Sequence, residues 1–386
     1  MATEPIYLDF NATTPLDPRV ARAMQPVLEQ FHGNPSSSHV FGQRARQAVE
    51  AARVQVAELL GAQPENIIFT SGGTEANNHA ILGAAFSAPE SRRRIVTSRI
   101  EHPAVTEVCQ FLERFGFVTT YVDVDAHGTV DPDTMISALD KDTALVTLML
   151  ANNEVGTLQP VSEVAAAARR LGIPSHSDCA QAVGKIPVKL DQLGVDLISV
   201  AGHKLYAPQG IGVLVMREGV SVTKLMHGAG HENGRRAGTE NILEIVALGK
   251  ACALANHGLE KEMQRLAGLR DTLAAGLVAS LGRCQVHGHP GGPEHRLPNT
   301  LSIGFADAAA QEIMAAMPEV AVSAGAACHG DGAEMSHVLQ AMGVAPEYGF
   351  GTLRISLGRT TTADQVNQAI AHIVRAVKQV REKRTG

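Results

Sequence analysis

The sequence predicts an α/β fold with a mostly parallel sheet, and three observations lead to this prediction. Short apolar runs rich in β-branched residues alternate with Ala-rich helical patterns over the first two-thirds of the chain. Strands that form continuous apolar runs are typical of parallel sheets covered by helices on both faces. The chain has 386 residues, of which 45% are hydrophobic, and this is enough for one large domain with a second, smaller one.

The predicted elements follow in order along the chain. The stretch 46–60 places Val49, Val56 and Leu59 at helical spacing, and Gly61 ends that helix. Six apolar runs are predicted as strands: 67–70, 94–98, 117–124, 145–150, 195–201 and 212–216. Ala-rich helical segments such as 161–171 lie between several of them, as expected for a parallel sheet with helical crossovers.

The last third of the chain has a different pattern. Helical material over about 244–281 leads into strands at 300–305 and 353–357. A final amphipathic helix begins at Ala363 and repeats apolar residues along one face. This order of elements indicates a second, smaller α+β domain.

The boundary between the two predicted domains is irregular. Residues 288–298 are rich in Gly, Pro and His, which indicates a loop without regular structure. We expect a large domain over 15–255. A smaller domain is then formed by 1–14 together with 256–386.

Charge and composition argue against several classes of partner and location. The net charge is −6, so bulk electrostatics favour neither nucleic acid nor an anionic membrane. The N-terminus lacks a signal-peptide pattern, and the longest mostly apolar run, 144–151, is too short to span a bilayer. Five cysteines without CxxC spacing fit free thiols in a reducing, cytoplasmic location.

A lysine that follows a buried strand is the first candidate for chemistry. Lys204 lies in the segment 199–208, Ser-Val-Ala-Gly-His-Lys-Leu-Tyr-Ala-Pro. Desolvation at a strand end lowers the pKa of a lysine and suits its amine to form a Schiff base with an aldehyde. A lone lysine there is more often a surface residue, so this interpretation depends on the segments upstream.

Two upstream segments supply groups for a phosphate and for a flat ring. Residues 70–77, Thr-Ser-Gly-Gly-Thr-Glu-Ala-Asn, end a strand and open a helix, so free N–H groups and the Thr74 hydroxyl can cradle a phosphate. His102 follows the strand that ends at Ser98, and its imidazole can lie on an aromatic cofactor. Each signal is weak alone, because Gly-Gly turns and loop histidines are common.

Two more segments complete the predicted set. Asp178, which follows a short extended stretch, can pair with a protonated pyridine nitrogen, although a helix N-cap is an alternative role. Asn152 and Asn153 close the strand 145–150 with amides that can touch a ring or a substrate. All five segments follow predicted strands, where open α/β sheets bind their ligands. Together they predict a site for a phosphorylated, electron-withdrawing ring anchored by Lys204.

With these segments the sequence resembles the class V, aminotransferase-fold group of pyridoxal-phosphate (PLP) enzymes, specifically cysteine desulfurases and selenocysteine lyases. The resemblance covers nearly the whole chain and implies fold type I, with a mostly parallel, seven-stranded type of sheet in the large domain. It is also carried by Tyr-Leu-Asp-Phe-Asn-Ala-Thr-Thr-Pro (7–15), Gly-Asn-Pro-Ser-Ser (33–37), His-Gly-Ala-Gly-His-Glu (227–232), Arg-Arg-Ala-Gly-Thr (235–239) and Leu-Arg-Ile-Ser-Leu-Gly-Arg (353–359).

The resemblance implies a role for each matching residue. It implies that PLP is held by Gly73, Thr74 and His203 at the phosphate, His102 on the ring, Asp178 at the pyridine nitrogen, Gln181 at the ring hydroxyl, Asn153 beside the ring and Lys204 in the Schiff base. Asn153, Asn11 and Arg354 are expected to bind the substrate, with Arg354 as a bidentate clamp on its carboxylate. In this family the residue matching Thr239 reaches the phosphate of the other subunit, so the match implies a homodimer.

The resemblance also makes Cys328 the nucleophile. Its segment, 323–332, is rich in Gly and Ala and is expected to be a mobile loop of the small domain. The implied reaction has Lys204 remove the α-proton and the Cys328 thiolate attack the substrate sulfur, with His102 as proton donor or acceptor. Alanine is the co-product, and a sulfur- or selenium-acceptor protein is a compatible partner. Cys328, His329 and His337 lack a second pair at zinc spacing, so no metal is expected.

Cysteine and selenocysteine both stay open as substrates. Residues 325–329, 150–154 and 202–206 resemble selenocysteine lyases more than desulfurases. After the ring-stacking histidine, however, desulfurases usually carry Lys and selenocysteine lyases Asp, whereas this chain has Pro103. The family also usually has Ser where this chain has Ala201, which removes one hydrogen bond to phosphate, worth about 1–3 kcal/mol if its partner stays unpaired.

Three other functions are compatible with parts of the sequence. Another class V aminotransferase or C–S lyase would use the same scaffold without Cys328 and give an oxo acid or pyruvate. A cofactor-binding protein without turnover would not need the complete set of candidate residues. A dinucleotide oxidoreductase would need a GxGxxG motif after the first strand, which this chain lacks.

Overall fold

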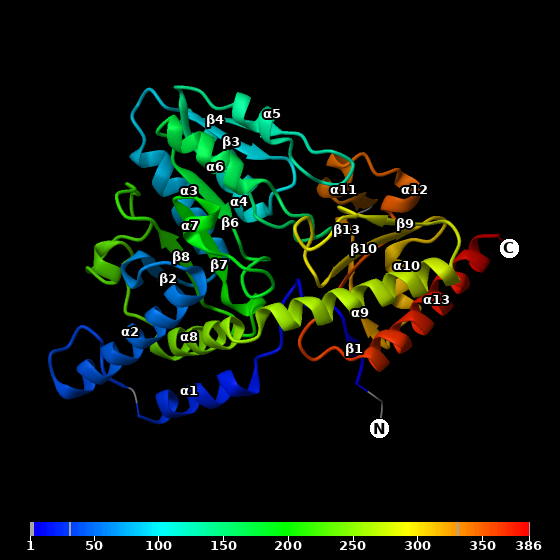
Figure 1. The fold of residues 1–386 in the computed structure, drawn as a ribbon, viewed down its shortest axis with the longest axis horizontal. Helices are drawn as coiled ribbons and strands as arrows, with labels where there is room; N and C mark the ends of the chain where they lie inside the picture. The colour runs from blue at the N-terminus through cyan, green and yellow to red at the C-terminus, as the bar shows by residue number, and fades with distance from the viewer. Residues whose placement is uncertain (1–3, 31, 330–331, 386) are drawn as a thin grey trace.

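The computed structural model describes residues 4–30, 32–329 and 332–385. Two lobes lie side by side, and each is built around its own sheet (Figure 1). The long helix α9 (Leu259–Ser280) extends from the middle of the molecule across the smaller lobe. The N-terminal strand β1 (Ile6–Tyr7) pairs in parallel with β11 (Val320–Ala321), so the chain starts in the smaller lobe.

The larger lobe contains a seven-stranded sheet in the order β2-β8-β7-β6-β5-β3-β4. Its strands are β2 (Ile67–Thr70), β3 (Arg94–Ser98), β4 (Val118–Val122), β5 (Thr143–Thr147), β6 (Ser175–Asp178), β7 (Leu197–Ala201) and β8 (Gly212–Met216). Strand β8 is antiparallel to β2 and β7, and the other neighbouring pairs are parallel. The predicted α/β class and mostly parallel sheet are therefore confirmed. Strand β5 ends three residues earlier than predicted, and Asp178 closes a strand instead of following one.

Helices cover both faces of this sheet. Successive residues of a strand point to opposite sides, and here both sets are apolar and are buried. Ile68 and Ile95 pack into the core beneath α3 and α4, whereas the next residues, Phe69 and Val96, pack into the core on the other face. The helices of this lobe are α1 (Pro18–Gln30), α2 (Val40–Leu60), α3 (Gly73–Ser87), α4 (Pro103–Glu113), α5 (Pro132–Ser137), α6 (Val161–Arg170), α7 (Leu190–Leu193) and α8 (Ile242–Asn256).

The smaller lobe contains a four-stranded antiparallel sheet in the order β12-β15-β10-β9. Its elements are β9 (Cys284–His287), β10 (Thr300–Phe305), α10 (Ala310–Ala315), β12 (Ser323–Ala324), α11 (His337–Ala341), α12 (Pro346–Gly349), β15 (Thr352–Ser356) and α13 (Ala363–Thr385). The predicted helical stretch 244–281 is two helices, α8 and α9. Ile6 and Leu8 belong to the core beneath α9 and α13, which supports the proposal that 1–14 is part of the smaller domain.

A hairpin occupies the segment that the sequence predicts as a mobile loop. Strands β13 (Ala326–His329) and β14 (Gly332–Met335) pair antiparallel, with Cys328 opposite Ala333. Small residues leave the backbone free to pair in this way. The structure describes the backbone of Cys328 and not its side chain, so its predicted role stays a prediction.

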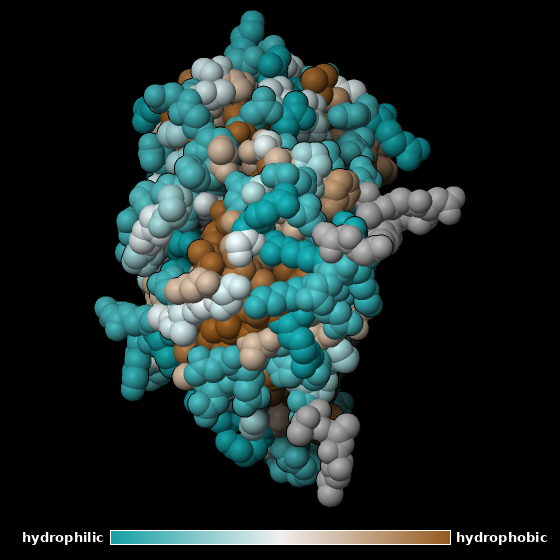
Figure 2. Space-filling model, turned by 90° about the vertical axis from the view of Figure 1, so that its right-hand side faces the viewer, coloured by the Kyte–Doolittle hydropathy of each residue, from teal (hydrophilic) through white to brown (hydrophobic). Residues whose placement is uncertain are grey.

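The face of the molecule shown in Figure 2 is mostly hydrophilic around a central strip of hydrophobic residues. Across the described ranges, no single helix is long and apolar enough to cross a membrane. Helices α8 and α9 meet that test of length and composition only as a pair bent by 76°.

Candidate functional site

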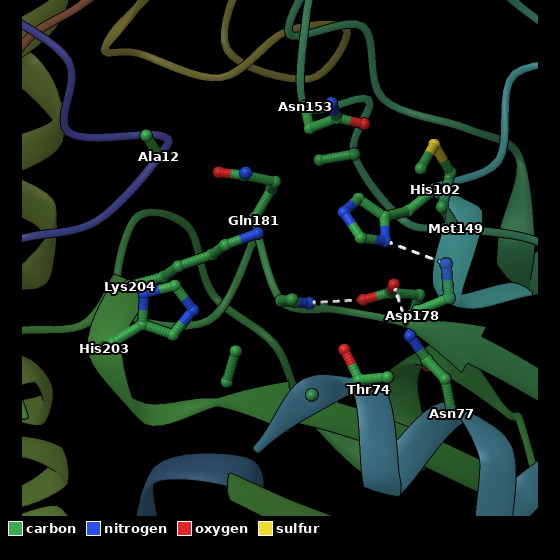
Figure 3. Close-up of a pocket in the computed structure, with 15 residues that line it drawn as sticks. Ala12, Thr74, Asn77, His102, Met149, Asn153, Asp178, Gln181, His203 and Lys204 are labelled. Atoms are coloured by element: carbon green, nitrogen blue, oxygen red, sulfur yellow. Dashed lines mark hydrogen bonds between the residues drawn. The ribbon is translucent and has the colours of Figure 1, made fainter. Parts of the chain in front are cut away.

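The predicted site residues converge at one edge of the large sheet. Strands β2, β3, β5, β6 and β7 run in the same direction, so the segments that follow them meet at one cavity (Figure 3). Eight predicted residues line it: Gly73, Thr74, His102, Asn153, Asp178, Gln181, His203 and Lys204. Asn77, Met149, Ala180 and Ala201 are also part of the lining.

One end of the cavity is suited to an anion. Gly72 precedes α3 without a capping side chain, so the first N–H groups of this 15-residue helix are not capped by it. Thr74 and His203 lie at this end (Figure 3). A Cβ atom on Gly73 would stand 3.1 Å from the Cβ atom of Ala201, so close packing of α3 against the end of β7 favours glycine there.

A buried carboxylate also lines the cavity. Asp178 accepts hydrogen bonds from Asn77 Nδ2 at 2.8 Å and from the backbone N–H of Ala180 at 2.9 Å. Asn77 Oδ1 is buried and has no partner among the described residues. The sequence analysis gave Asn77 no role, although it lies one helical turn after Gly73 and so faces the same side of α3.

His102 lines the cavity on the same side as Asp178 (Figure 3). Its Nδ1 accepts a hydrogen bond of 3.1 Å from the backbone N–H of Ala104, which leaves the proton of the neutral ring on Nε2. Burial lowers the pKa of His102 against the opposing effect of Asp178, and the charges of Lys204 and Arg354 lower it further. The ring is therefore an uncharged N–H donor at neutral pH, and it also caps α4.

Lys204 enters the cavity from the side opposite His102 and Asp178 (Figure 3). It ends the short helix η2 (Gly202–Lys204) directly after β7. Burial lowers the pKa of its amine, Asp178 acts in the opposite direction and Arg354 lowers it further. A lowered pKa increases the uncharged, nucleophilic fraction of the amine at neutral pH.

Glu101, directly before His102, is a fully buried acid that the sequence analysis gave no role. Its carboxyl accepts hydrogen bonds from Ser98 Oγ at 2.6 Å and from the backbone N–H of Met149 at 3.0 Å. Burial raises the pKa of Glu101 to about 8, with these hydrogen bonds opposing the shift. The acid joins the ends of β3 and β5 beneath the cavity.

The smaller lobe is tied to the loops that follow these two strands. His337 Nε2 donates to the Glu101 carbonyl at 3.0 Å, and the Ser336 hydroxyl donates to the carboxylate of Glu154. Both donors come directly after β14. The hairpin that contains Cys328 is therefore fixed at its base to two walls of the cavity.

Two predicted substrate ligands do not line the cavity. Arg354 Nη2 donates to Asp9 Oδ1 at 3.0 Å and to Ser323 Oγ at 2.9 Å, while its Nη1 lies 3.3 Å from the Asn153 carbonyl. The Asn11 amide donates to the Asn153 carbonyl and to Thr300 Oγ1, and its oxygen also accepts hydrogen bonds from the protein. Protein contacts therefore occupy the side chain of Asn11 in this structure, and its expected role in binding the substrate stays a prediction.

Thr239 is exposed on the segment between β8 and α8 and does not line the cavity of its own chain. Throughout the described residues, no group of three or more His, Cys, Asp or Glu side chains is placed to hold a metal ion. Cys109, Cys179 and Cys252 are buried free thiols, and Cys284 is a partly buried one.

Comparisons with known proteins agree with this geometry. The family model for aminotransferase class-V matches residues 6–369. The chain is 43% identical to "Cysteine desulfurase IscS" of Dictyoglomus turgidum, over 97% of this chain and 95% of that protein. It is also 43% identical to "Cysteine desulfurase" of Trichormus azollae, over 97% and 94% of the two chains.

Solved structures show the same relationship. A structure titled "NIFS-LIKE PROTEIN" superposes with a TM-score of 0.90 at 35% identity, covering 97% of this chain and all of the other. A NifS-like protein from Rickettsia africae superposes with a TM-score of 0.86 at 30% identity, covering 98% and 100%. The match over most of the chain, the identity to curated relatives and the shared fold lead to one conclusion: this chain belongs to the aminotransferase class-V family and is a homologue of cysteine desulfurases.

Proposed function

We propose that this protein removes sulfur from L-cysteine with PLP as cofactor, giving L-alanine and a persulfide on Cys328. One observation carries the proposal: the Lys204 amine, the Asp178 carboxylate, the His102 ring and the start of α3 share a single cavity. Members of the aminotransferase class-V family use PLP, and the relatives named above are cysteine desulfurases.

The residues of the cavity fit PLP. The N–H groups at the start of α3, with Thr74 and His203, would hold the phosphate. Asp178, fixed by two hydrogen bonds, would pair with the pyridine nitrogen, and the uncharged His102 would lie on the ring. Gln181 would contact the ring hydroxyl, Asn153 the ring or substrate, and Lys204 would bind the aldehyde carbon covalently. When bound, the cofactor supplies an electron-withdrawing ring that stabilises negative charge at the substrate α-carbon.

The chain's own groups then control protons and orientation. Lys204 is placed to remove the α-proton, because its lowered pKa favours the uncharged base. His102 presents Nε2–H toward the cavity and can donate a proton to the departing three-carbon product. Arg354 would bind the substrate carboxylate after exchanging its contact with Asp9.

Cys328 completes the reaction. Its thiolate attacks the substrate sulfur, so an S–S bond forms while the C–S bond breaks and its electron pair passes to carbon. Protonation of that carbon fragment and its release give alanine, while the sulfur stays on Cys328 for an acceptor protein. The fixed base of the hairpin supports this role, because it keeps the strand of Cys328 near the cavity.

A homodimer in a reducing, cytoplasmic setting is part of the proposal. Thr239 is exposed and away from the cavity of its own chain, which is compatible with a contact to the phosphate bound by a second subunit. Selenocysteine is the second candidate substrate, favoured by the Gly-Ala-Ala-Cys-His segment at 325–329. The proposal for this substrate includes release of selenide.

Absorbance and turnover test the proposal together. The purified protein should show a visible band of bound PLP, and Lys204→Ala should abolish that band. Cys328→Ala should keep the band and lose alanine formation from cysteine, whereas Cys252→Ala, which changes a buried thiol elsewhere, should keep both. Turnover of cysteine and selenocysteine side by side separates the two substrates. A Lys204→Ala protein with an unchanged band would refute the assignment.

A further inference from the structure

A second lysine lies behind the wall of the cavity, and none of the roles described above uses it. Lys185 is 8% exposed, and its amine donates to Gln181 Oε1 at 2.7 Å and to Asn11 Oδ1 at 2.8 Å. Gln181 lies four residues earlier in the chain, and both residues belong to the turns that follow β6. A buried lysine is unusual and is normally paired with a carboxylate.

The contacts of Lys185 fix the orientation of the Gln181 amide. Gln181 Nε2 donates to the backbone carbonyl of Asn11 at 3.0 Å, while its oxygen accepts from Lys185. If the amide were turned over, its oxygen would face the Asn11 carbonyl oxygen and lose both hydrogen bonds. The remaining N–H of Gln181 is therefore the group available on the cavity side, where it would donate to a ring oxygen.

The same amine also orders Asn11. With Lys185 and Asn299 donating to its oxygen, the Asn11 amide nitrogen is left to donate to Thr300 Oγ1 at 2.9 Å and to the Asn153 carbonyl at 3.2 Å. All hydrogen-bonding positions of the Asn11 side chain are thus occupied. The Lys185 amine is therefore linked to Gln181 directly and to the loop of Asn153 through Asn11.

The surroundings of Lys185 favour an uncharged amine. The amine donates to two neutral amide oxygens, and an uncharged amine has two N–H groups to match them. Among the described residues, no carboxylate forms an ion pair with Lys185. Burial lowers the pKa of Lys185 well below its usual value, and the positive charges of Lys204 and Arg354 lower it further. An ammonium group here would be a buried charge without a counter-ion.

We propose that Lys185 is a positioning residue that holds Gln181 with its N–H toward the cofactor and locks Asn11 against the loop of Asn153. The inference rests on the proposed function, because it assigns the purpose of Lys185 to the PLP site. Lys185 itself does not line the cavity.

The test uses the full-length protein, first freed of cofactor and then titrated with PLP. Lys185→Met removes both hydrogen bonds and should weaken PLP binding about tenfold, as expected for one lost hydrogen bond to the ring, and shift the visible band. Lys185→Gln keeps an uncharged donor and should restore part of the affinity. Lys189→Met is the matched control, because that lysine is partly exposed and donates to the carbonyls of Glu58 and Leu59.

A double-mutant cycle separates positioning from general stability. Because Lys185 acts partly through Gln181, Lys185→Met should weaken PLP binding less in a Gln181→Ala background than in the wild-type protein. Thermal unfolding of the cofactor-free variants checks that each one folds. A wild-type protein without a Lys204-dependent band would overturn the proposed function as well. A normal wild type with an unchanged Lys185→Met band and affinity, or with additive effects in the cycle, would overturn this inference alone.

Discussion

A buried ion pair that anchors the segment carrying Thr239 gives the sharpest prediction about stability. Glu232, 5% exposed, accepts from Arg53 Nη1 and Nη2 at 2.9 and 2.8 Å, and from the backbone N–H of Phe69 at 2.9 Å. Arg53 belongs to α2 and is itself 6% exposed. The pair therefore fixes the segment after β8 to the start of the large sheet.

Glu232→Ala should lower the free energy of unfolding substantially. The change removes the buried carboxylate from Arg53 and leaves it only the more exposed Glu50 at 3.2 Å, and losing one partner of a buried pair costs up to about 3–5 kcal/mol. The unfolding entropy of 386 residues is about 0.8 kcal/mol per degree at ~2.1 cal/mol/K per residue. The expected fall in melting temperature is therefore about 4–6 °C.

Calorimetry at saturating PLP measures this fall with two comparison variants. Glu312→Ala breaks a pair with Arg384 in which the acid and the arginine are 52% and 47% exposed, so it should cost at most about 1 kcal/mol, or about 1 °C. The double variant Arg53→Met with Glu232→Met should recover much of the loss, since no unpaired charge remains. If Glu232→Ala melts no lower than Glu312→Ala, the reasoning about this pair is wrong.

Three further predictions concern the site. Ala201→Ser adds a hydroxyl next to Gly73 and should tighten PLP binding by up to about tenfold in a titration of the cofactor-free protein; weaker binding would contradict this. The pKa of Glu101 is about 8 in the folded chain, against a reference of 4.5 for the unfolded chain. The protonated acid therefore contributes stability that is fully present below pH 4.5 and is lost as the pH rises through 8. The melting temperature of Glu101→Gln should accordingly vary less than that of the wild type between roughly pH 5 and 9, and parallel curves would refute this origin. Ser336→Ala removes the donor to Glu154, so cysteine turnover should fall while PLP absorbance stays unchanged; equal turnover would show that the hairpin needs no such anchor.

Polar strands were harder to predict than apolar ones. The runs 67–70, 94–98, 212–216 and 300–305 match their strands residue for residue, because β-branched apolar residues signal a buried strand directly. Strand β6, Ser-His-Ser-Asp, gives no such signal although it is fully buried. Its His176 is satisfied by Thr147 and Ser199 on the neighbouring strands, and such pairing exists only once the sheet is formed.

The sequence by itself determined the α/β class and the segments that meet in the cavity, since residues that follow parallel strands must gather at one edge of the sheet. The family resemblance added Gln181 and His203 to that set. Only the tertiary structure decided what surrounds them: that Asn11 and Arg354 contact the protein, and that Lys185 lies buried on two amide oxygens. The reason is physical. Burial, desolvation and hydrogen-bond partners come from segments far apart in the chain, so no local pattern encodes them.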